Sequence, residues 1–359
     1  MSGTSVDGLD AALVEVSGTG LMMKARVLHT ASRTLGTLGP ILRKMVDQHL
    51  MSAGEMARAM TEFSLLHIAA IREACGGKNP DLICVHGQTV FHAPPHSWQM
   101  LQPSPIARVF GCPVVYDLRA ADIAAGGQGA PITPLADLVL FGDEKRRRGV
   151  VNLGGFCNVT LLPRSEGSLE SQRDGIVARD VCACNHVLDL IARERFGVPF
   201  DEQGSAAAGA NQIDGEALDG LRALVQGQAK SGRSLGTGDE LFAWLQKCSG
   251  VPGNVLARTA CMAIAETILE VCGEVEVLIL AGGGTRNEAL VGFVREGARD
   301  REQVVLLSSD VGIDVSARES ACFAVLGALC QDGVPITLPQ VTGVKVAPVS
   351  GSWVGRERQ

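Results

Sequence analysis

The sequence predicts an α/β fold in two lobes, and three observations point to it. Short β-type apolar runs alternate with long helical patterns, which is typical of α/β proteins with mostly parallel sheets. The length of 359 residues exceeds what one small core needs and suits two domains of ordinary size. Several glycine-rich turns follow apolar runs. We therefore expect an N-terminal lobe over residues 1–147 and a C-terminal lobe over 148–359, with a binding cleft between them.

The elements are expected in a regular order along the chain. Apolar runs predict strands at 10–16, 81–85, 113–116, 149–152, 275–280 and 303–307. Helical spacing predicts helices at 41–75, 185–196, 254–271, from 287 onward, and at 317–329. The Gly- and Ser-rich stretch 226–239 is expected to be a surface loop. Segments 2–16 and 150–162 resemble each other as strand-turn-strand units, so each lobe would open on a glycine hairpin.

Composition and charge exclude several classes of protein. The formal net charge of −7 and the aromatic content of 4% argue against a nucleic-acid groove, which needs basic surface and stacking side chains. No apolar stretch approaches the roughly 18 residues of a membrane span, and the N-terminus has no signal-peptide pattern. We expect a cytoplasmic protein that binds neither membrane nor nucleic acid.

The cysteines are expected to be reduced and buried. Their number, 11, is odd, and most lie within apolar runs, so no disulfide framework is implied. The closest grouping is Cys182-Ala183-Cys184-Asn185-His186. A zinc site there would need a second pair of ligands, and none stands at suitable spacing. Metal binding at this grouping is therefore not expected.

The N-terminal turn has the composition of a phosphate-handling hairpin. It runs Ser2-Gly3-Thr4-Ser5-Val6-Asp7-Gly8-Leu9-Asp10 and leads into a strand. Glycines let the backbone approach phosphate oxygens, hydroxyls donate to them, and a carboxylate can hold hydrated magnesium. Alone, such a stretch is better interpreted as an ordinary polar turn between strands.

Further glycine turns make the phosphate interpretation stronger. Asn152-Leu153-Gly154-Gly155 and Ala281-Gly282-Gly283-Gly284 each follow an apolar run, and Ala125-Gly126-Gly127-Gln128-Gly129-Ala130-Pro131 lies between them and the first turn. Two lobes that each carry a glycine hairpin would hold a polyphosphate from both sides.

Six motifs in order resemble one known family. They are 2–10, the His86-Gly87-Gln88-Thr89-Val90-Phe91-His92 run, Asp117-Leu118-Arg119 with 122–131, 152–160, 281–287 and 338–343. In these motifs the chain resembles, from end to end, the anhydro-N-acetylmuramic acid kinases of the sugar kinase, Hsp70 and actin superfamily. The resemblance implies a two-lobed actin-like ATPase fold, with a mixed β-sheet flanked by helices in each lobe, and a cytoplasmic homodimer.

The resemblance also implies the reaction. In cell-wall (peptidoglycan) recycling, the family converts 1,6-anhydro-N-acetylmuramic acid, ATP and water to N-acetylmuramic acid 6-phosphate and ADP. A carboxylate activates a water that attacks the anomeric carbon, while the oxygen at C6 takes the γ-phosphoryl group. The implied cofactors are ATP and Mg²⁺.

Residue by residue, the resemblance implies these roles. The residues expected at the phosphates are Gly3, Thr4, Ser5, Val6, Asp7, Gly8, Leu9 and Asp10 in a first loop, with Asp7 holding magnesium, and Asn152, Gly154 and Gly155 in a second. Gly282, Gly283 and Gly284 resemble the adenosine loop. Thr89, Arg119 and Glu319 match sugar-contacting positions, and Asp180 matches the general base. Without the motifs, a structural ion pair is the better interpretation of Arg119 with Asp122, and a surface charge is the better interpretation of Glu319.

Three departures from the family pattern affect the expected activity. The family loop Asp-Thr-Gly-Pro-Gly-Asn is here Asp180-Val181-Cys182-Ala183-Cys184-Asn185, and Leu101 stands where the family has glycine. If the replaced glycines have positive φ, cysteine would cost about 1–2 kcal/mol at each position and add bulk beside the ligand. Family members also carry apolar residues ahead of the first turn; either this sequence starts downstream of the natural start, or its first hairpin is shorter.

Three functions therefore remain open. The first is an active anhydro-N-acetylmuramic acid kinase. The second is a kinase for a related anhydro or amino sugar, which the altered loops favour. The third is a catalytically silent ATP-binding paralogue, against which the retained Asp180 speaks, since a binding module has no need of that acid.

Overall fold

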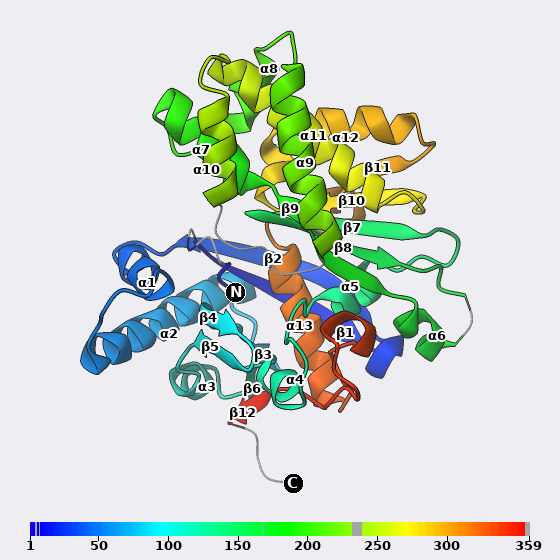
Figure 1. Cartoon of the computed structure of the whole chain (residues 1–359). Helices are drawn as coiled ribbons and strands as arrows, with labels where there is room; N and C mark the ends of the chain where they lie inside the picture. Colours follow the sequence, from blue (N-terminus) through cyan, green and yellow to red (C-terminus); the bar gives the residue numbers. More distant parts are fainter. Residues whose placement is uncertain (4–5, 7, 167, 232–238, 356–359) are drawn as a thin grey trace. The chain divides into compact units, whose positions relative to one another are not determined.

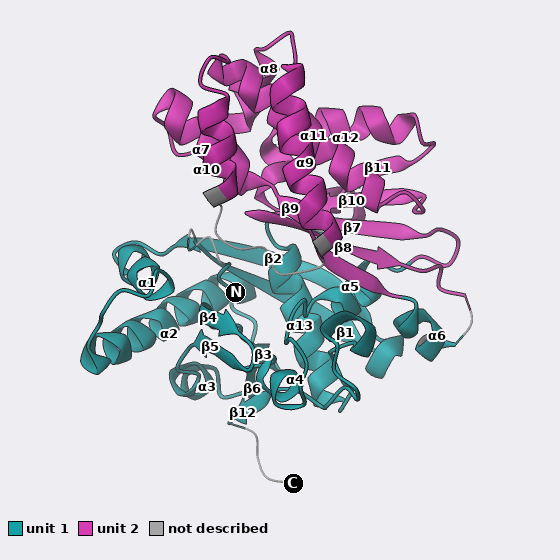
Figure 2. Cartoon of the chain, viewed as in Figure 1, with its two compact units in different colours: residues 1–142, 167–175, 312–359 teal, residues 143–166, 176–311 magenta. Residues whose placement is uncertain are grey.

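The computed structural model describes residues 1–3, 6, 8–166, 168–231 and 239–355. The chain forms two compact units (Figure 2). Unit 1 comprises residues 1–142, 167–175 and 312–359, and unit 2 comprises 143–166 and 176–311. Each unit has its own buried apolar core and is described by itself.

The strands of unit 1 form three small sheets. β1 (Gly8–Ser17) and β2 (Lys24–Thr34) pair antiparallel. β4 (Gln88–Ala93) and β5 (His96–Met100) make an antiparallel hairpin. The third sheet has the order β12 (Ser352–Val354), β6 (Val114–Tyr116), β3 (Ile83–Cys84), with β3 parallel and β12 antiparallel to β6. The chain's last described strand thus completes a sheet that the first third begins.

Several helices of unit 1 pack against these strands (Figure 1). The helices of this unit are α1 (Leu38–Val46), α2 (Ala53–Cys75), α3 (Ser104–Phe110), α4 (Ala120–Ala124), α5 (Pro134–Phe141), α6 (Leu169–Asp174), α13 (Arg318–Gln331) and α14 (Pro339–Thr342). α2 begins at a capping box, in which the Ser52 side chain accepts from the Glu55 amide and the Glu55 carboxylate accepts from the Ser52 amide. It ends at Gly76, whose φ of +55° only glycine adopts without strain. Both ends of the longest helix are therefore set by local sequence.

Unit 2 is built on one five-stranded mixed sheet. Its order is β11 (Val304–Leu307), β10 (Val277–Ala281), β7 (Arg148–Leu153), β8 (Phe156–Leu162) and β9 (Val177–Ala183). β11, β10 and β7 run parallel, while β8 is antiparallel to both β7 and β9. The carboxyl ends of β7, β9, β10 and β11 therefore lie at the same edge of the sheet.

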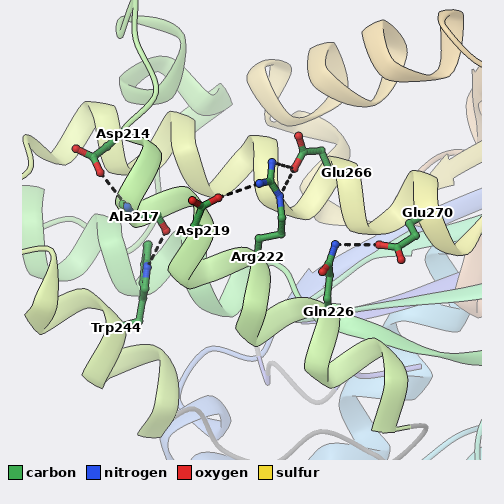
Figure 3. Close-up of polar contacts among 8 residues, drawn as sticks. All are labelled: Asp214, Ala217, Asp219, Arg222, Gln226, Trp244, Glu266 and Glu270. Atoms are coloured by element: carbon green, nitrogen blue, oxygen red, sulfur yellow. Dashed lines mark hydrogen bonds and ion pairs between the residues drawn. The ribbon is translucent and has the colours of Figure 1, made fainter.

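The helices of unit 2 are α7 (Asn185–Phe196), α8 (Ser205–Ala208), α9 (Gly215–Ser231), α10 (Asp239–Lys247), α11 (Gly253–Val271) and α12 (Glu288–Arg299). Figure 3 shows polar contacts that join α9 to its neighbours. Arg222 Nε and Nη2 donate to Glu266 at 2.9 and 2.7 Å, and Gln226 Nε2 donates to Glu270 at 3.0 Å. The buried Trp244 of α10 donates to the Ala217 carbonyl at 3.0 Å. These contacts fix α9 along α11.

The α/β class and the mixed sheets are confirmed, with three corrections. Antiparallel strand pairs outnumber parallel ones in the part of the chain described, so the expectation of mostly parallel sheets was wrong. The helical pattern over 41–75 is two helices, because the chain turns between Asp47 and Ser52, where Gln48 has a φ of +59°. The expected loop 226–239 is helical as far as Ser231, since α9 continues through Gly227; residues 232–238 lie outside the described residues.

The segment 312–359 belongs to unit 1, whereas it was expected in a C-terminal lobe over 148–359. The physical reason is α13, which packs against β1, β3 and α5 of that unit. Unit 1 ends its first segment at Gly142, five residues before the expected boundary at 147. No helix among the described residues is long and apolar enough to cross a membrane.

Candidate functional site

In unit 2, two of the predicted glycine turns lie at one edge of the sheet. Gly154 and Gly155 follow β7, and Gly282 follows β10, the parallel neighbour of β7. The register pairs Ala281 with Asn152, so the two strands end side by side. Neighbouring strand ends in open α/β sheets are where ligands commonly bind.

The backbone at this edge is packed too closely for side chains. A Cβ on Gly282 would lie 2.6 Å from Asn152 Oδ1, and its φ of +87° also requires glycine. A Cβ on Gly284 would lie 2.8 Å from the Cβ of Leu153 and 2.9 Å from Asn185 Oδ1. By contrast, a Cβ on Gly283 would meet nothing closer than 3.9 Å. The structure therefore brings the predicted second phosphate turn and adenosine loop together.

The start of α7 closes onto the same turn. The amides of Cys184 and His186 donate to the Gly155 carbonyl at 2.9 and 3.1 Å, and the Asn185 amide donates to the Gly154 carbonyl at 3.0 Å. The Asn185 side chain donates to the Leu153 carbonyl at 3.3 Å. Asn185 was not among the predicted site residues; the signal for it was its place at the end of the altered loop.

Asp180, the predicted general base, lies in β9 of unit 2. The register places it opposite Asn158, which is itself opposite Asn152. Asn152, Asn158 and Asp180 thus form one row across β7, β8 and β9, and partners in such a row point to the same face of a sheet. Asn158 was not predicted as a site residue, although it stands in the 152–160 motif.

The Asp180 carboxyl is half-buried, and this burial raises its pKa above the ordinary 3.8. Among the described residues of unit 2, none donates a hydrogen bond to it or pairs with it as a cation. A carboxylate with a raised pKa and free lone pairs has the properties of a general base.

The altered loop after Asp180 does not show the strain considered above. Val181, Cys182, Ala183 and Cys184 are all described, and none has a positive φ. All four are fully buried in the apolar core of unit 2. Val181 is the extra residue of a β-bulge, because Asp180 pairs with Asn158 while Cys182 pairs with Cys157. The cysteine side chains fill core space, and the positive φ on which the expected backbone cost depended does not occur here.

Leu101, the other departure from the family pattern, is also buried. It is 9% exposed and packs in the core of unit 1. This side chain, like the two cysteines, serves packing.

The first predicted phosphate loop lies in unit 1, and three of its residues, Thr4, Ser5 and Asp7, lie outside the described residues. The Gly3 carbonyl accepts from the Gln88 side chain at 3.2 Å, and the Ser2 hydroxyl donates to Gln88 at 2.8 Å. Val6 has a φ of +52° and donates its amide to the Gly3 carbonyl. Gln88 therefore joins the N-terminal motif 2–10 by hydrogen bonds to the motif 86–92, which contains Thr89.

The remaining residues of that loop begin β1. Gly8 and Leu9 are strand residues, and Leu9 is buried in the core of unit 1. Asp10 Oδ1 accepts from the Ser32 hydroxyl of β2 at 2.5 Å. No group of three or more His, Cys, Asp or Glu side chains in the described part of the chain is arranged to hold a metal ion.

The predicted sugar residues Arg119 and Glu319 both belong to unit 1, where the Glu319 charge acts on Arg119. Burial lowers the pKa of Arg119 to about 10, and the Glu319 charge acts against that shift. Burial and the Arg119 charge also lower the pKa of His92, which shares β4 with Thr89. Charge effects of this kind weaken with distance, so Glu319 and the β4–β5 hairpin lie within the electrostatic range of Arg119.

Arg119 and Asp122 do not form the ion pair considered above. Arg119 Nη1 donates to the Gly129 carbonyl at 2.7 Å, and Asp122 Oδ2 accepts from the Gly129 amide at 2.7 Å. Both side chains therefore hold the same loop residue.

The structure defines the class as an α/β protein with close-packed glycine turns at the carboxyl ends of neighbouring strands, the place where ligands commonly bind in open α/β sheets. The chain belongs to the anhydro-N-acetylmuramic acid kinase family, whose model matches residues 1–355. It is therefore a kinase, a phosphotransferase with an alcohol group as acceptor.

Known proteins of this family match nearly the whole chain. An anhydro-N-acetylmuramic acid kinase of Bacillus cereus is 28% identical over 383 residues, covering 98% of this chain and 97% of that protein. One of Bacillus thuringiensis subsp. konkukian is 28% identical over 378 residues with the same coverage. Among solved structures, component A of the (R)-2-hydroxyglutaryl-CoA dehydratase of Acidaminococcus fermentans is 13% identical, with a TM-score of 0.42 over 90% of this chain and 99% of that chain.

Proposed function

We propose that the chain uses ATP to phosphorylate 1,6-anhydro-N-acetylmuramic acid at O6 while hydrolysing its anhydro bridge, as one step of cell-wall recycling. The observation that carries this proposal is the Asp180 carboxyl: it has a raised pKa, has no partner among the described residues of unit 2, and lies in one row of the sheet with Asn152. Water is a poor nucleophile, and a positioned carboxylate that takes its proton is what attack on the anomeric carbon requires.

The proposed step balances as follows. The Asp180 carboxylate takes a proton from water, and the water oxygen bonds to C1. The bond between C1 and O6 breaks, and O6 attacks the γ-phosphorus of ATP, from which ADP leaves. The proton on Asp180 then returns to solvent, which restores the base.

The nucleotide is proposed to be held by turns that only glycine can form. Gly282 and Gly284 have no room for a Cβ, so their backbone can approach a ligand closely. Asn152, Gly154 and Gly155, together with the loop Gly3–Asp10, would contact the phosphates, and Gly283 would face the adenosine. Asp7 would hold hydrated magnesium, which neutralises phosphate charge when bound.

The sugar is proposed to contact Thr89, Arg119 and Glu319. The effect of the Glu319 charge on Arg119, and of the Arg119 charge on His92 in the strand of Thr89, supports this assignment. A cytoplasmic homodimer is proposed on the family resemblance.

The test is product analysis. The purified chain is incubated with Mg-ATP and 1,6-anhydro-N-acetylmuramic acid, and the products are identified by phosphorus NMR and mass spectrometry. We expect N-acetylmuramic acid 6-phosphate. Phosphorylation of a sugar without the lactyl ether, with no product from the anhydromuramic acid, would reject the proposed substrate in favour of a related sugar.

A further inference from the structure

The glycine loop 126–129 in unit 1 is wound tightly around one buried carboxylate. The Gly127 amide donates to the Asp122 carbonyl at 2.8 Å, and a Cβ on Gly127 would lie 2.2 Å from Asp122 Oδ2. Gly129, with a φ of +66°, would place a Cβ 2.7 Å from Ile123. The loop can follow this path only because glycine stands at both positions.

The carboxylate of Asp122 is fully buried, and its partners are neutral. Oδ2 accepts from the Gly129 amide at 2.7 Å, and Oδ1 accepts from the Thr342 hydroxyl at 2.9 Å. No cation among the described residues forms an ion pair with it. Burying a carboxylate without a paired cation is costly, so these two hydrogen bonds are the compensation the structure provides.

Thr342 holds the same loop a second time. Its carbonyl accepts from the Gln128 amide at 2.8 Å, and its side chain is 1% exposed. Thr342 ends the short helix α14, and Gly343, with a φ of +76°, follows it. The motif 338–343 has no part in the proposed chemistry, yet it touches the loop through both a hydroxyl and a carbonyl.

The loop in turn holds Arg119. Arg119 Nη1 donates to the Gly129 carbonyl at 2.7 Å, while its Nε is buried and has no hydrogen-bond partner among the described residues. The guanidinium thus has one fixed contact, and that contact is with the residue whose amide Asp122 holds. A shift of Gly129 would move the guanidinium with it.

We propose that Asp122 and Thr342 are positioning residues that fix the loop 126–129 and, through Gly129, the Arg119 guanidinium that contacts the sugar. This inference rests on the proposed function both for the contact of Arg119 with the sugar and for the identity of that sugar. It assigns the C-terminal motif 338–343 to the sugar half of the site.

The test compares Thr342→Val with Thr342→Ser. Valine keeps the shape and removes the hydroxyl, whereas serine retains it. We expect Thr342→Val to raise the KM for the anhydro sugar about tenfold, the usual scale for losing one buried hydrogen bond, while the KM for ATP stays within about twofold. Thr342→Ser is expected to restore the sugar KM. Hydrogen–deuterium exchange of the peptide that contains 126–129 is expected to quicken in Thr342→Val alone.

Each outcome decides one point. Faster exchange in Thr342→Val with an unchanged sugar KM would overturn the positioning role. Unchanged exchange would show that Thr342 does not hold the loop 126–129. If Thr342→Val does not fold, Asp122→Asn is measured in the same way. Asparagine has a single side-chain oxygen, so it cannot accept both of the hydrogen bonds that Asp122 accepts. Hydrogen–deuterium exchange is measured without any turnover. A wild-type chain that is inactive on the sugar would therefore reject the proposed function, while the exchange data would still test whether Thr342 holds the loop 126–129.

Discussion

Arg318 and Asp137 form a buried two-point ion pair that joins α13 to α5 within unit 1. Arg318 Nε lies 3.0 Å from Asp137 Oδ1, and Arg318 Nη2 contacts Asp137 Oδ2. The two side chains are 2% and 0% exposed. Burial alone would lower the pKa of Arg318, but the Asp137 charge raises it above its ordinary value. The pair anchors the first residue of α13, and Glu319 is the second residue of that helix.

Breaking this pair is expected to destabilise unit 1. Asp137→Ala leaves a buried guanidinium without its counter-charge, which costs about 3–5 kcal/mol of the free energy of unfolding. The double variant Asp137→Leu with Arg318→Met removes both charges and is expected to recover most of that loss. Urea denaturation followed by tryptophan fluorescence measures both. A single variant as stable as the parent would show that the pair does not anchor α13.

Removing the proposed base is expected to abolish turnover and leave nucleotide binding. Asp180→Asn keeps the shape of the side chain but cannot take a proton, so the rate is expected to fall roughly 100- to 10,000-fold. Calorimetry is expected to show ATP affinity within a few-fold of the parent. Turnover near the parent rate would show that Asp180 is structural.

The pH dependence of Asp180 has a defined sign. Burial raises the folded-state pKa of Asp180 above 3.8. The contribution of this group to the free energy of unfolding is therefore fully present below pH 3.8 and is lost as pH rises through the folded-state pKa. Asp180→Asn removes this loss, so the variant is expected to unfold at higher urea than the parent at about pH 7. In the parent, the rate is expected to rise with pH through the same raised pKa. Equal stability of both proteins at neutral pH would contradict the burial effect.

Alanine at two neighbouring glycines is expected to have different effects. In Gly282→Ala the new Cβ would clash with Asn152 Oδ1, and alanine would have to adopt a positive φ that favours glycine. The expected cost is about 1–3 kcal/mol of the free energy of unfolding. Gly283→Ala is the matched control, because its Cβ would meet no atom closer than 3.9 Å. The control is expected to keep the parent melting temperature and to weaken ATP binding, since Gly283 is proposed to face the adenosine. Unchanged ATP affinity in Gly283→Ala would place the nucleotide elsewhere.

Restoring the family loop is expected to destabilise the chain. Cys182 and Cys184 are fully buried in the core of unit 2, so replacing either with glycine leaves a cavity and a freer backbone. The expected loss is on the order of 1–3 kcal/mol for each position, measured by thermal denaturation. A restored loop that raises both stability and turnover would show that the present loop is a degraded form.

Much of the fold follows from local pattern. Helix α7 was predicted at its observed bounds, and β7 and β10 within a few residues, because these are long periodic or uniformly apolar segments. The break between α1 and α2 was missed, although Ser52 with Glu55 is a capping box visible in the sequence. β9 was missed because Asp180–Asn185 was interpreted as a family loop, and only the pairing with β8 makes its first part a strand.

The candidate site was predictable as a set of motifs but not as an arrangement. Which turns meet depends on sheet order, and β7 beside β10 joins residues far apart in sequence. The loop 126–129 and the motif 338–343 were both identified from the sequence. The sequence alone does not indicate that the Thr342 hydroxyl donates a hydrogen bond to Asp122. The burial of Cys182 in the core of unit 2 was also missed, because the sequence does not show which way a side chain points.

The most direct measurement is ADP release by the purified chain in Mg-ATP, with 1,6-anhydro-N-acetylmuramic acid present and absent. The proposed function predicts ADP release that depends on the sugar, in a one-to-one ratio with phosphosugar, and that is lost in Asp180→Asn. ATP binding by calorimetry without any sugar-dependent ADP release would contradict the account and favour a silent nucleotide-binding protein.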